Sequence, residues 1–125
     1  MINGAHLLFY STNPDADRAF LKDVLDLQGV DAGRGWMIYK LPPSEIAVHP
    51  TEEPFVMGHA DRKMLGAILY LMCDDVAVTI KEVEARGAKC APVEEARWGH
   101  FTTFELPSGA CIGLYQPLHP VAIDL

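Results

Sequence analysis

The sequence has little positive charge. Lys and Arg together number 10 against 17 Asp and Glu, which gives a formal net charge of −7 at pH 7. Nucleic acids and anionic membranes attract proteins through clustered Lys and Arg side chains, and no such cluster is evident in this sequence. We therefore expect neither nucleic acid nor a membrane as a partner.

Paired cysteines and long hydrophobic runs are also missing. The three cysteines, Cys73, Cys90 and Cys111, are odd in number and not closely spaced. This usage favours reduced thiols and a cytoplasmic location. No apolar run approaches the roughly 18 residues of a membrane span, and residues 1–4 lack the basic start of a signal peptide.

What the sequence does contain is enough apolar material for one compact domain. Half of its 125 residues are hydrophobic, and nine prolines and ten glycines punctuate the chain. A chain of this length can bury one core, and this density of punctuation indicates many short elements. We therefore expect a single domain over residues 1–125.

A repeat divides this domain into two halves. Gly4-Ala5-His6-Leu7 opens the first half and Gly66-Ala67-Ile68-Leu69 opens the second, 62 positions later. Each opening leads through strand-like residues to a helix-capping residue, Asn13 and then Asp75. Each half closes on a Leu-Pro turn and a short apolar strand that ends in proline. The repeat predicts two modules (3–50 and 65–117), a linker (51–64) and a tail (118–125).

Both halves follow the order β-α-β-β-β. In the first half, Pro14 follows the cap and an apolar stripe that includes Phe20 and Val24 predicts a helix. In the second half, Gly87 has the position of a glycine that ends a helix. The predicted strands are 5–10, 28–31, 36–40 and 45–49 in the first half, then 68–73, 89–93, 98–106 and 111–116 in the second.

Two such modules resemble the vicinal oxygen chelate superfamily, which includes glyoxalase I, bleomycin-resistance proteins and extradiol dioxygenases. The most specific parts of the likeness are residues 6–20, 71–76 and 112–117. The resemblance implies an α+β fold of the glyoxalase/bleomycin resistance/dioxygenase-like type. Its two βαβββ modules form a half-open eight-stranded barrel, and the cavity of the barrel holds a small-molecule ligand. The resemblance also implies a homodimer.

The metal site of this superfamily is largely missing from the sequence. Metal-using members place a ligand on the first strand and on the last strand of each module. These positions fall on His6, Ala47, Ile68 and Gly113, so one of four keeps a metal-binding side chain. We therefore expect no cofactor.

A rearranged metal site is the alternative. Glu45, Ala47 and His49 share one face of the predicted strand 45–49, because side chains alternate along a strand. In the superfamily this strand lies beside the first one, which would bring Glu45 or His49 near His6. Such a set could hold a divalent ion, Fe, Zn, Ni or Mn.

Strand alternation also predicts which side chains line the cavity. If His6 points inward, so do the residues two and four positions later, and the matched strand of the second half follows the same rule. Ala47 and Gly113 would leave space at the base of the cup. The predicted ligand-binding residues are His6, Leu8, Tyr10, Trp36, Ala47, His49, Ile68, Tyr70, Met72, Trp98, His100, Gly113 and Tyr115.

Two functions fit these patterns. The first is a binding protein of the bleomycin-resistance type, without the usual metal site, that holds an apolar or aromatic small molecule in the barrel cavity. The acidic composition would favour cationic ligands in such a protein. The second is a metal-dependent lyase, isomerase or dioxygenase with a rearranged site around His6. Loss of three ligand positions favours the first function.

Overall fold

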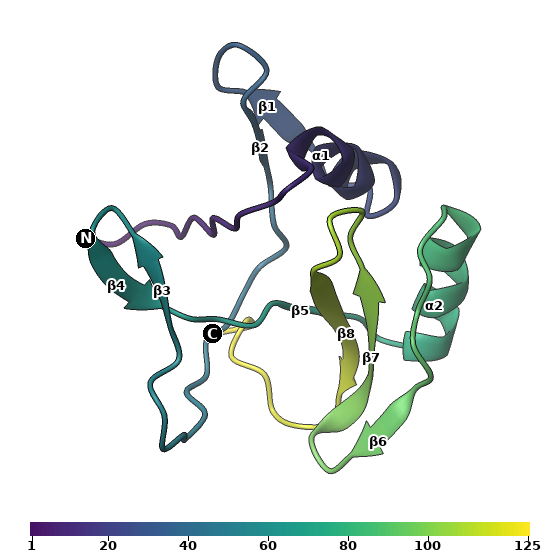
Figure 1. Cartoon of the computed structure of the whole chain (residues 1–125). Coiled ribbons are helices and arrows are strands. Elements are labelled where there is room, and N and C mark those ends of the chain that lie inside the picture. Colours follow the sequence, from purple (N-terminus) through teal and green to yellow (C-terminus); the bar gives the residue numbers. More distant parts are fainter.

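The second half of the chain folds in the predicted order. A computed structural model describes residues 1–125 and shows an α+β architecture (Figure 1). Strands β5, β8, β7 and β6 form one sheet in that order, with β5 parallel to β8 and the other neighbours antiparallel. The elements are β5 (Tyr70–Met72), α2 (Val76–Ala85), β6 (Glu94–Ala96), β7 (Gly99–Glu105) and β8 (Cys111–Pro117).

The ends of α2 follow the capping signals of the sequence. The Asp75 carboxylate accepts a hydrogen bond from the Val78 backbone N–H at 3.2 Å, which satisfies a free donor in the first turn. Beyond the helix, Gly87 has φ +113, a conformation that L side chains rarely adopt. Both predicted ends of the helix are thus confirmed.

Helix α1 (Pro14–Asp23) belongs to the first half and packs against the second half. The Phe20 ring stacks on Phe104 of β7 with ring centroids 5.9 Å apart. Asp17, only 2% exposed, accepts hydrogen bonds from the Ser108 backbone N–H at 3.0 Å and from its hydroxyl at 2.6 Å. Ser108 lies in the turn between β7 and β8, so a buried carboxylate joins the two halves.

The core lies between the two helices and one face of the four-stranded sheet. Phe104 is its most buried large side chain, at 1% exposure. Residues of α1, α2, β7 and β8 contribute to it, which places the core almost wholly on the second half. The buried cluster is Val24, Val76, Val83, Ala88, Phe104, Leu106, Ile112 and Leu114.

The first half forms fewer strands than the sequence predicts. Strands β1 (Gly29–Asp31) and β2 (Met37–Tyr39) pair antiparallel, which confirms the predicted strands 28–31 and 36–40. Segments 5–10 and 45–49 join no sheet, and nearly all their residues are exposed. A strand-like pattern becomes a strand only where a neighbouring backbone completes the hydrogen-bond ladder, and these segments have no such neighbour within the chain. The chain therefore has sheets of two, two and four strands, and the eight-stranded barrel stays a prediction.

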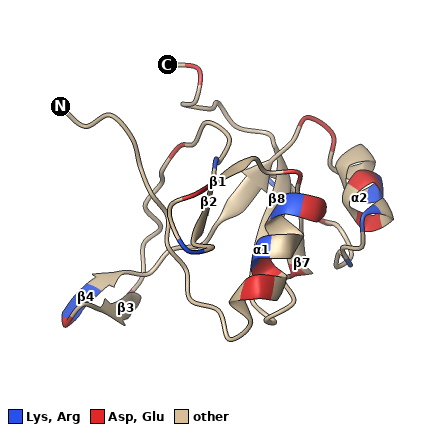
Figure 2. Cartoon of the chain, turned by 90° about the horizontal axis from the view of Figure 1, so that it is seen from above, with Lys and Arg blue, Asp and Glu red and all other residues tan.

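The predicted linker contains a β-hairpin, an element that the sequence pattern did not predict there. Strands β3 (Val56–His59) and β4 (Arg62–Leu65) pair antiparallel and project away from the four-stranded sheet (Figure 1). Ala60 and Asp61 form the tight turn with φ of +51 and +59. Such turns usually carry Asn-Gly or Asp-Gly, so Ala-Asp gives no hairpin signal. Figure 2 shows basic residues at this end of β4, away from the two helices.

The strand predicted over 89–93 is displaced. Only Cys90 makes an isolated bridge, to Phe104, and the regular strand β6 begins at Glu94. Neither helix is long and apolar enough to cross a membrane.

Candidate ligand-binding face

The two faces of the four-stranded sheet differ in what covers them. Along β7, Thr102 and Phe104 point to the core side, and Ile112 and Leu114 of β8 do the same. Alternation places Phe101, Gly113 and Tyr115 on the opposite face. The helices pack on the core side and leave this second face without a covering helix; on it Trp98 is 40% exposed and Tyr115 8%.

Four aromatic side chains gather on this open face. The Trp98 ring stacks on Phe101 with centroids 4.8 Å apart and planes 21° apart. Tyr70 meets Trp98, Phe101 and Tyr115 edge-on, with centroids 5.9, 6.4 and 5.4 Å away. We call Tyr70, Trp98, Phe101 and Tyr115 the aromatic face.

Two glycines form the floor of the aromatic face. A Cβ on Gly113 would lie 2.2 Å from a ring carbon of Tyr70, and one on Gly99 would lie 2.9 Å from a ring carbon of Tyr115. Both rings therefore lie directly on the backbone, where only glycine leaves room. The space expected above Gly113 is filled by Tyr70 rather than left open.

A polar edge borders the aromatic face. The Tyr115 hydroxyl lies 3.0 Å from Nε2 of His119 and 3.3 Å from the sulfur of Met72. The His119 ring also stacks on the Tyr115 ring, with centroids 5.9 Å apart. Burial raises the pKa of Tyr115, and the nearby carboxylate of Glu45 raises it further, so the hydroxyl stays protonated and can donate a hydrogen bond.

The C-terminal tail holds this polar edge in place. The backbone N–H of Leu118 donates to the carbonyl of Trp98 at 2.9 Å, directly beyond β8. Further along, the N–H of Ala122 donates to Oε1 of Glu45 at 2.9 Å. The tail thus brings His119 and the distant Glu45 to one side of the aromatic face. Aromatic rings bordered by a few polar groups are the usual surroundings of a bound small molecule.

Five of the predicted site residues come together at this face. Three of them contribute rings: Tyr70, Trp98 and Tyr115. Gly113 forms part of the floor, and the sulfur of Met72 contacts the Tyr115 hydroxyl at the polar edge.

His100 is placed differently from the prediction. It pairs with Gln116, whose side-chain oxygen accepts a hydrogen bond from the first N–H of α2, at Val76. His100 and Thr102 therefore lie on the core side of the sheet, and the residue between them, Phe101, lies on the opposite face.

The predicted residues of the first half do not reach the aromatic face. Tyr10 hydrogen-bonds His59 of the hairpin. Trp36 lies under the guanidinium of Arg18, 5.4 Å from the ring centroid. The other predicted residues of the first half are exposed and join no sheet: His6, Leu8, Ala47 and His49. The same is true of Ile68 in the second half.

Three residues of the candidate site were absent from the prediction: Gly99, Phe101 and His119. Phe101 was missed because the parity of β7 could not be fixed from Trp98 and His100 alone. The available signal was the size of Phe101 itself, a large apolar side chain directly after His100. His119 was missed because it follows the last strand, in a tail for which the sequence predicts no element.

The rearranged metal site is not assembled within the chain. The imidazole of His49 hydrogen-bonds the carbonyl of Pro50 at 2.8 Å, and Glu45 is engaged by Ala122. No group of three or more His, Cys, Asp or Glu side chains is arranged to hold a metal ion. His6, Glu45 and His49 are therefore not brought together within this chain.

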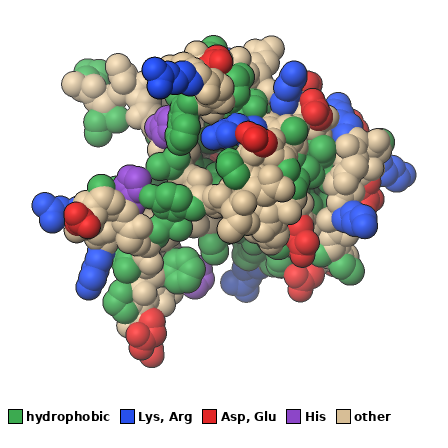
Figure 3. All heavy atoms as spheres, turned by 45° about the horizontal axis from the view of Figure 1, so that its top comes forward, with side chains coloured by type: hydrophobic (Ala, Val, Ile, Leu, Met, Phe, Trp, Pro, Cys, Tyr) green, Lys and Arg blue, Asp and Glu red, His purple; other side chains and the backbone are tan.

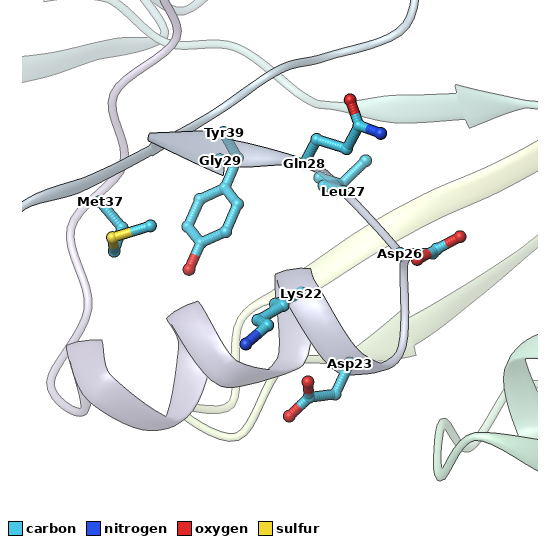
Figure 4. Close-up of a pocket in the computed structure, with 8 residues that line it drawn as sticks. All are labelled: Lys22, Asp23, Asp26, Leu27, Gln28, Gly29, Met37 and Tyr39. Atoms are coloured by element: carbon cyan, nitrogen blue, oxygen red, sulfur yellow. The ribbon is translucent and has the colours of Figure 1, made fainter. Parts of the chain in front are cut away.

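A groove lies elsewhere, between α1 and the β1–β2 pair. It measures about 810 Å³, and in Figure 4 Tyr39 of β2 points toward α1, from which Lys22 projects. The groove is open to solvent, and five of its eight lining residues are polar, charged or glycine, whereas small-molecule sites are mostly apolar and enclosed. We therefore place the candidate site at the aromatic face. The groove is lined by Lys22, Asp23, Asp26, Leu27, Gln28, Gly29, Met37 and Tyr39.

A second groove of about 500 Å³ surrounds the tip of the β3–β4 hairpin, where Arg62 and Lys63 lie beside Tyr10 and His59. It contains none of the four aromatic-face rings.

Solved structures share the fold of this chain along nearly its whole length. An antibiotic binding protein from a Streptomyces strain is 20% identical, with a TM-score of 0.62 over 94% of this chain and 98% of that one. The fosfomycin resistance protein FosX from Listeria monocytogenes is 13% identical, with a TM-score of 0.61 over all of both chains. A lactoylglutathione lyase from Agrobacterium tumefaciens is 17% identical, with a TM-score of 0.59 over 91% of this chain and 92% of that one.

By sequence alone, no family model and no curated protein matches the chain. The structural matches show that it has the glyoxalase/bleomycin-resistance fold, as the resemblance of its sequence implied. At these identities the likeness concerns the fold, and function has to be argued from the site.

Proposed function

We propose that this protein binds an apolar or aromatic small molecule on the aromatic face, without a metal centre. The observation that carries the proposal is the cluster of four rings on the uncovered face of the sheet, bordered by the Tyr115 hydroxyl and His119. Stacking on such rings adds about 0.5–1.5 kcal/mol per pair beyond the area buried.

The solved relatives are consistent with this proposal. One of them is described as an antibiotic binding protein and another as a fosfomycin resistance protein, so this fold supports the handling of small molecules. The lyase shows that the same fold also supports catalysis. Binding is favoured here because the side chains left from the predicted metal set are not brought together.

We further propose that the functional unit is a homodimer. The chain alone exposes 9934 Å², and only 13 of its 125 residues are buried. A compact protein of this mass exposes about 6,600 Å², so the surplus far exceeds the roughly 800 Å² that each partner buries in a standard interface. Figure 3 shows hydrophobic side chains open to solvent over the projecting parts of the molecule. A second copy would cover this surface and enclose the exposed side of the aromatic face.

Trp98 provides a direct test of the binding proposal. In a Trp36→Phe protein, Trp98 is the only tryptophan, so its emission reports on the aromatic face. We expect saturable changes in this emission when naphthalene-sized aromatic compounds are titrated, and weaker binding after Phe101→Ala. The control is Phe55→Ala, which removes a ring that is 69% exposed in the segment before β3. An unchanged emission with every compound of the panel would contradict the proposal.

Light scattering tests the assembly separately. A mass near twice 13.8 kDa at micromolar concentration is expected. A monomer mass at that concentration would refute the dimer and leave the binding proposal in place.

A further inference from the structure

The charge environment of the polar edge identifies a class of ligand. Glu45 is half-buried, and one carboxylate oxygen, Oε1, is held by the N–H of Ala122 at 2.9 Å. The other oxygen has no hydrogen-bond partner. The one ion pair in the structure joins Arg18 to Asp15, so no Lys or Arg neutralises Glu45.

The aromatic rings, like the Glu45 carboxylate, favour a positively charged ligand. The faces of Trp98, Tyr70 and Phe101 carry partial negative charge, which attracts cations within about 6 Å of a ring centroid. Trp98 is 40% exposed, so one side of the cluster remains accessible. The net charge of −7 draws cations toward the protein as a whole.

We propose that the aromatic face and Glu45 together form a site for an organic cation, a substituted ammonium carried on an aromatic body. The aromatic body lies against Trp98 and Phe101, and the ammonium group lies toward the free oxygen of Glu45. The Tyr115–His119 pair supplies a hydrogen bond to a polar group of the ligand. This inference rests on the proposed binding function and specifies its ligand.

A matched pair of ligands separates charge from shape. 3-(Trimethylammonio)phenol and 3-tert-butylphenol have the same outline and the same hydroxyl, and they differ only in the positive charge. Binding of each is followed through the indole N–H resonance of Trp98 in ¹⁵N-labelled protein, with the resonance of Trp36 as internal reference. We expect the cation to bind about fivefold more tightly at low salt, the size of a partly exposed cation–π and carboxylate contact.

Two variants locate the source of that preference. Glu45→Gln retains an oxygen that can accept from Ala122 and removes the charge, so the preference should fall to about twofold, the part contributed by the rings, while the neutral phenol binds as before. Unchanged binding of the neutral phenol also shows that this variant is folded. Glu52→Gln makes the same change of net charge at an exposed position and should leave the preference intact. Added salt should weaken binding of the cation alone.

The outcomes distinguish this inference from the function on which it rests. Equal affinities of the two phenols, or a preference that is undiminished in Glu45→Gln, would overturn the cation site and leave the aromatic binding face standing. No shift of the Trp98 resonance with either phenol would overturn both.

Discussion

Replacing Asp17 by Ala should weaken the joint between the two halves of the chain. The buried Asp17 carboxylate accepts two hydrogen bonds from Ser108, at 3.0 and 2.6 Å. A hydrogen bond to a charged group contributes about 1.5–3 kcal/mol. Because Ser108 is half-buried and water can partly replace the lost acceptor, we take the lower figure for each bond and expect a loss of about 3 kcal/mol.

Urea denaturation followed by far-UV circular dichroism measures this loss. The midpoint should fall at constant slope, and thermal unfolding should occur about 10 °C lower. Ser108→Ala removes only the hydroxyl donor and should cost about half as much. In the double variant the effects should be less than additive, since both substitutions remove the same contact.

Asp15→Ala is the matched control. Asp15 lies in the same first turn of α1, but its side chain is 97% exposed and its pairing with Arg18 is a surface contact. Such contacts are worth about 0–1 kcal/mol. If Asp17→Ala costs no more than Asp15→Ala, the buried carboxylate does not join the two halves and the reasoning fails.

Three further outcomes follow from the aromatic face and the sheet below it. Gly113→Ala should displace the Tyr70 ring, because the new Cβ would lie 2.2 Å from it, and the near-UV circular dichroism of the aromatic cluster should change; an unaltered spectrum would contradict the glycine floor. Cys111, which is exposed, should react with a thiol reagent before Cys73, whose pKa is raised chiefly by burial, and the reverse order in labelling followed by mass spectrometry would refute this. Burial raises the pKa of Tyr115 in the folded state. The contribution of Tyr115 to the free energy of unfolding should therefore be fully present below the ordinary tyrosine pKa of about 10 and be lost as pH rises through the pKa of the folded protein. A Tyr115→Phe protein that loses the same stability at alkaline pH would contradict this prediction.

The helices and three of the four second-half strands could be predicted because their signals are local. Asp75 and Gly87 bracket α2 through backbone hydrogen bonding and a left-handed conformation, both of which depend on the residue itself. The apolar stripe with Phe20 and Val24 likewise fixes which side of α1 packs on the core. These features do not depend on distant parts of the chain.

Features that depend on distant partners could not be predicted in this way. The segments 5–10 and 45–49 look like strands, but no strand of the same chain pairs with them. For the candidate site, alternation along β5 and β8 predicted that Tyr70 and Tyr115 share one face of the sheet, as the structure shows. The position of Phe101 was missed because the sequence prediction placed His100, rather than its neighbour, on the ligand face. The position of His119 was missed because it depends on how the tail passes β8.

The central claim is that ligand binds at the aromatic face of the four-stranded sheet. The most direct measurement is intermolecular nuclear Overhauser effects from the tert-butyl protons of bound 3-tert-butylphenol in isotopically labelled protein. The account predicts contacts to the rings of Trp98 and Phe101. Contacts to Leu27 and Tyr39 instead would place the ligand in the groove beside α1 and contradict the account.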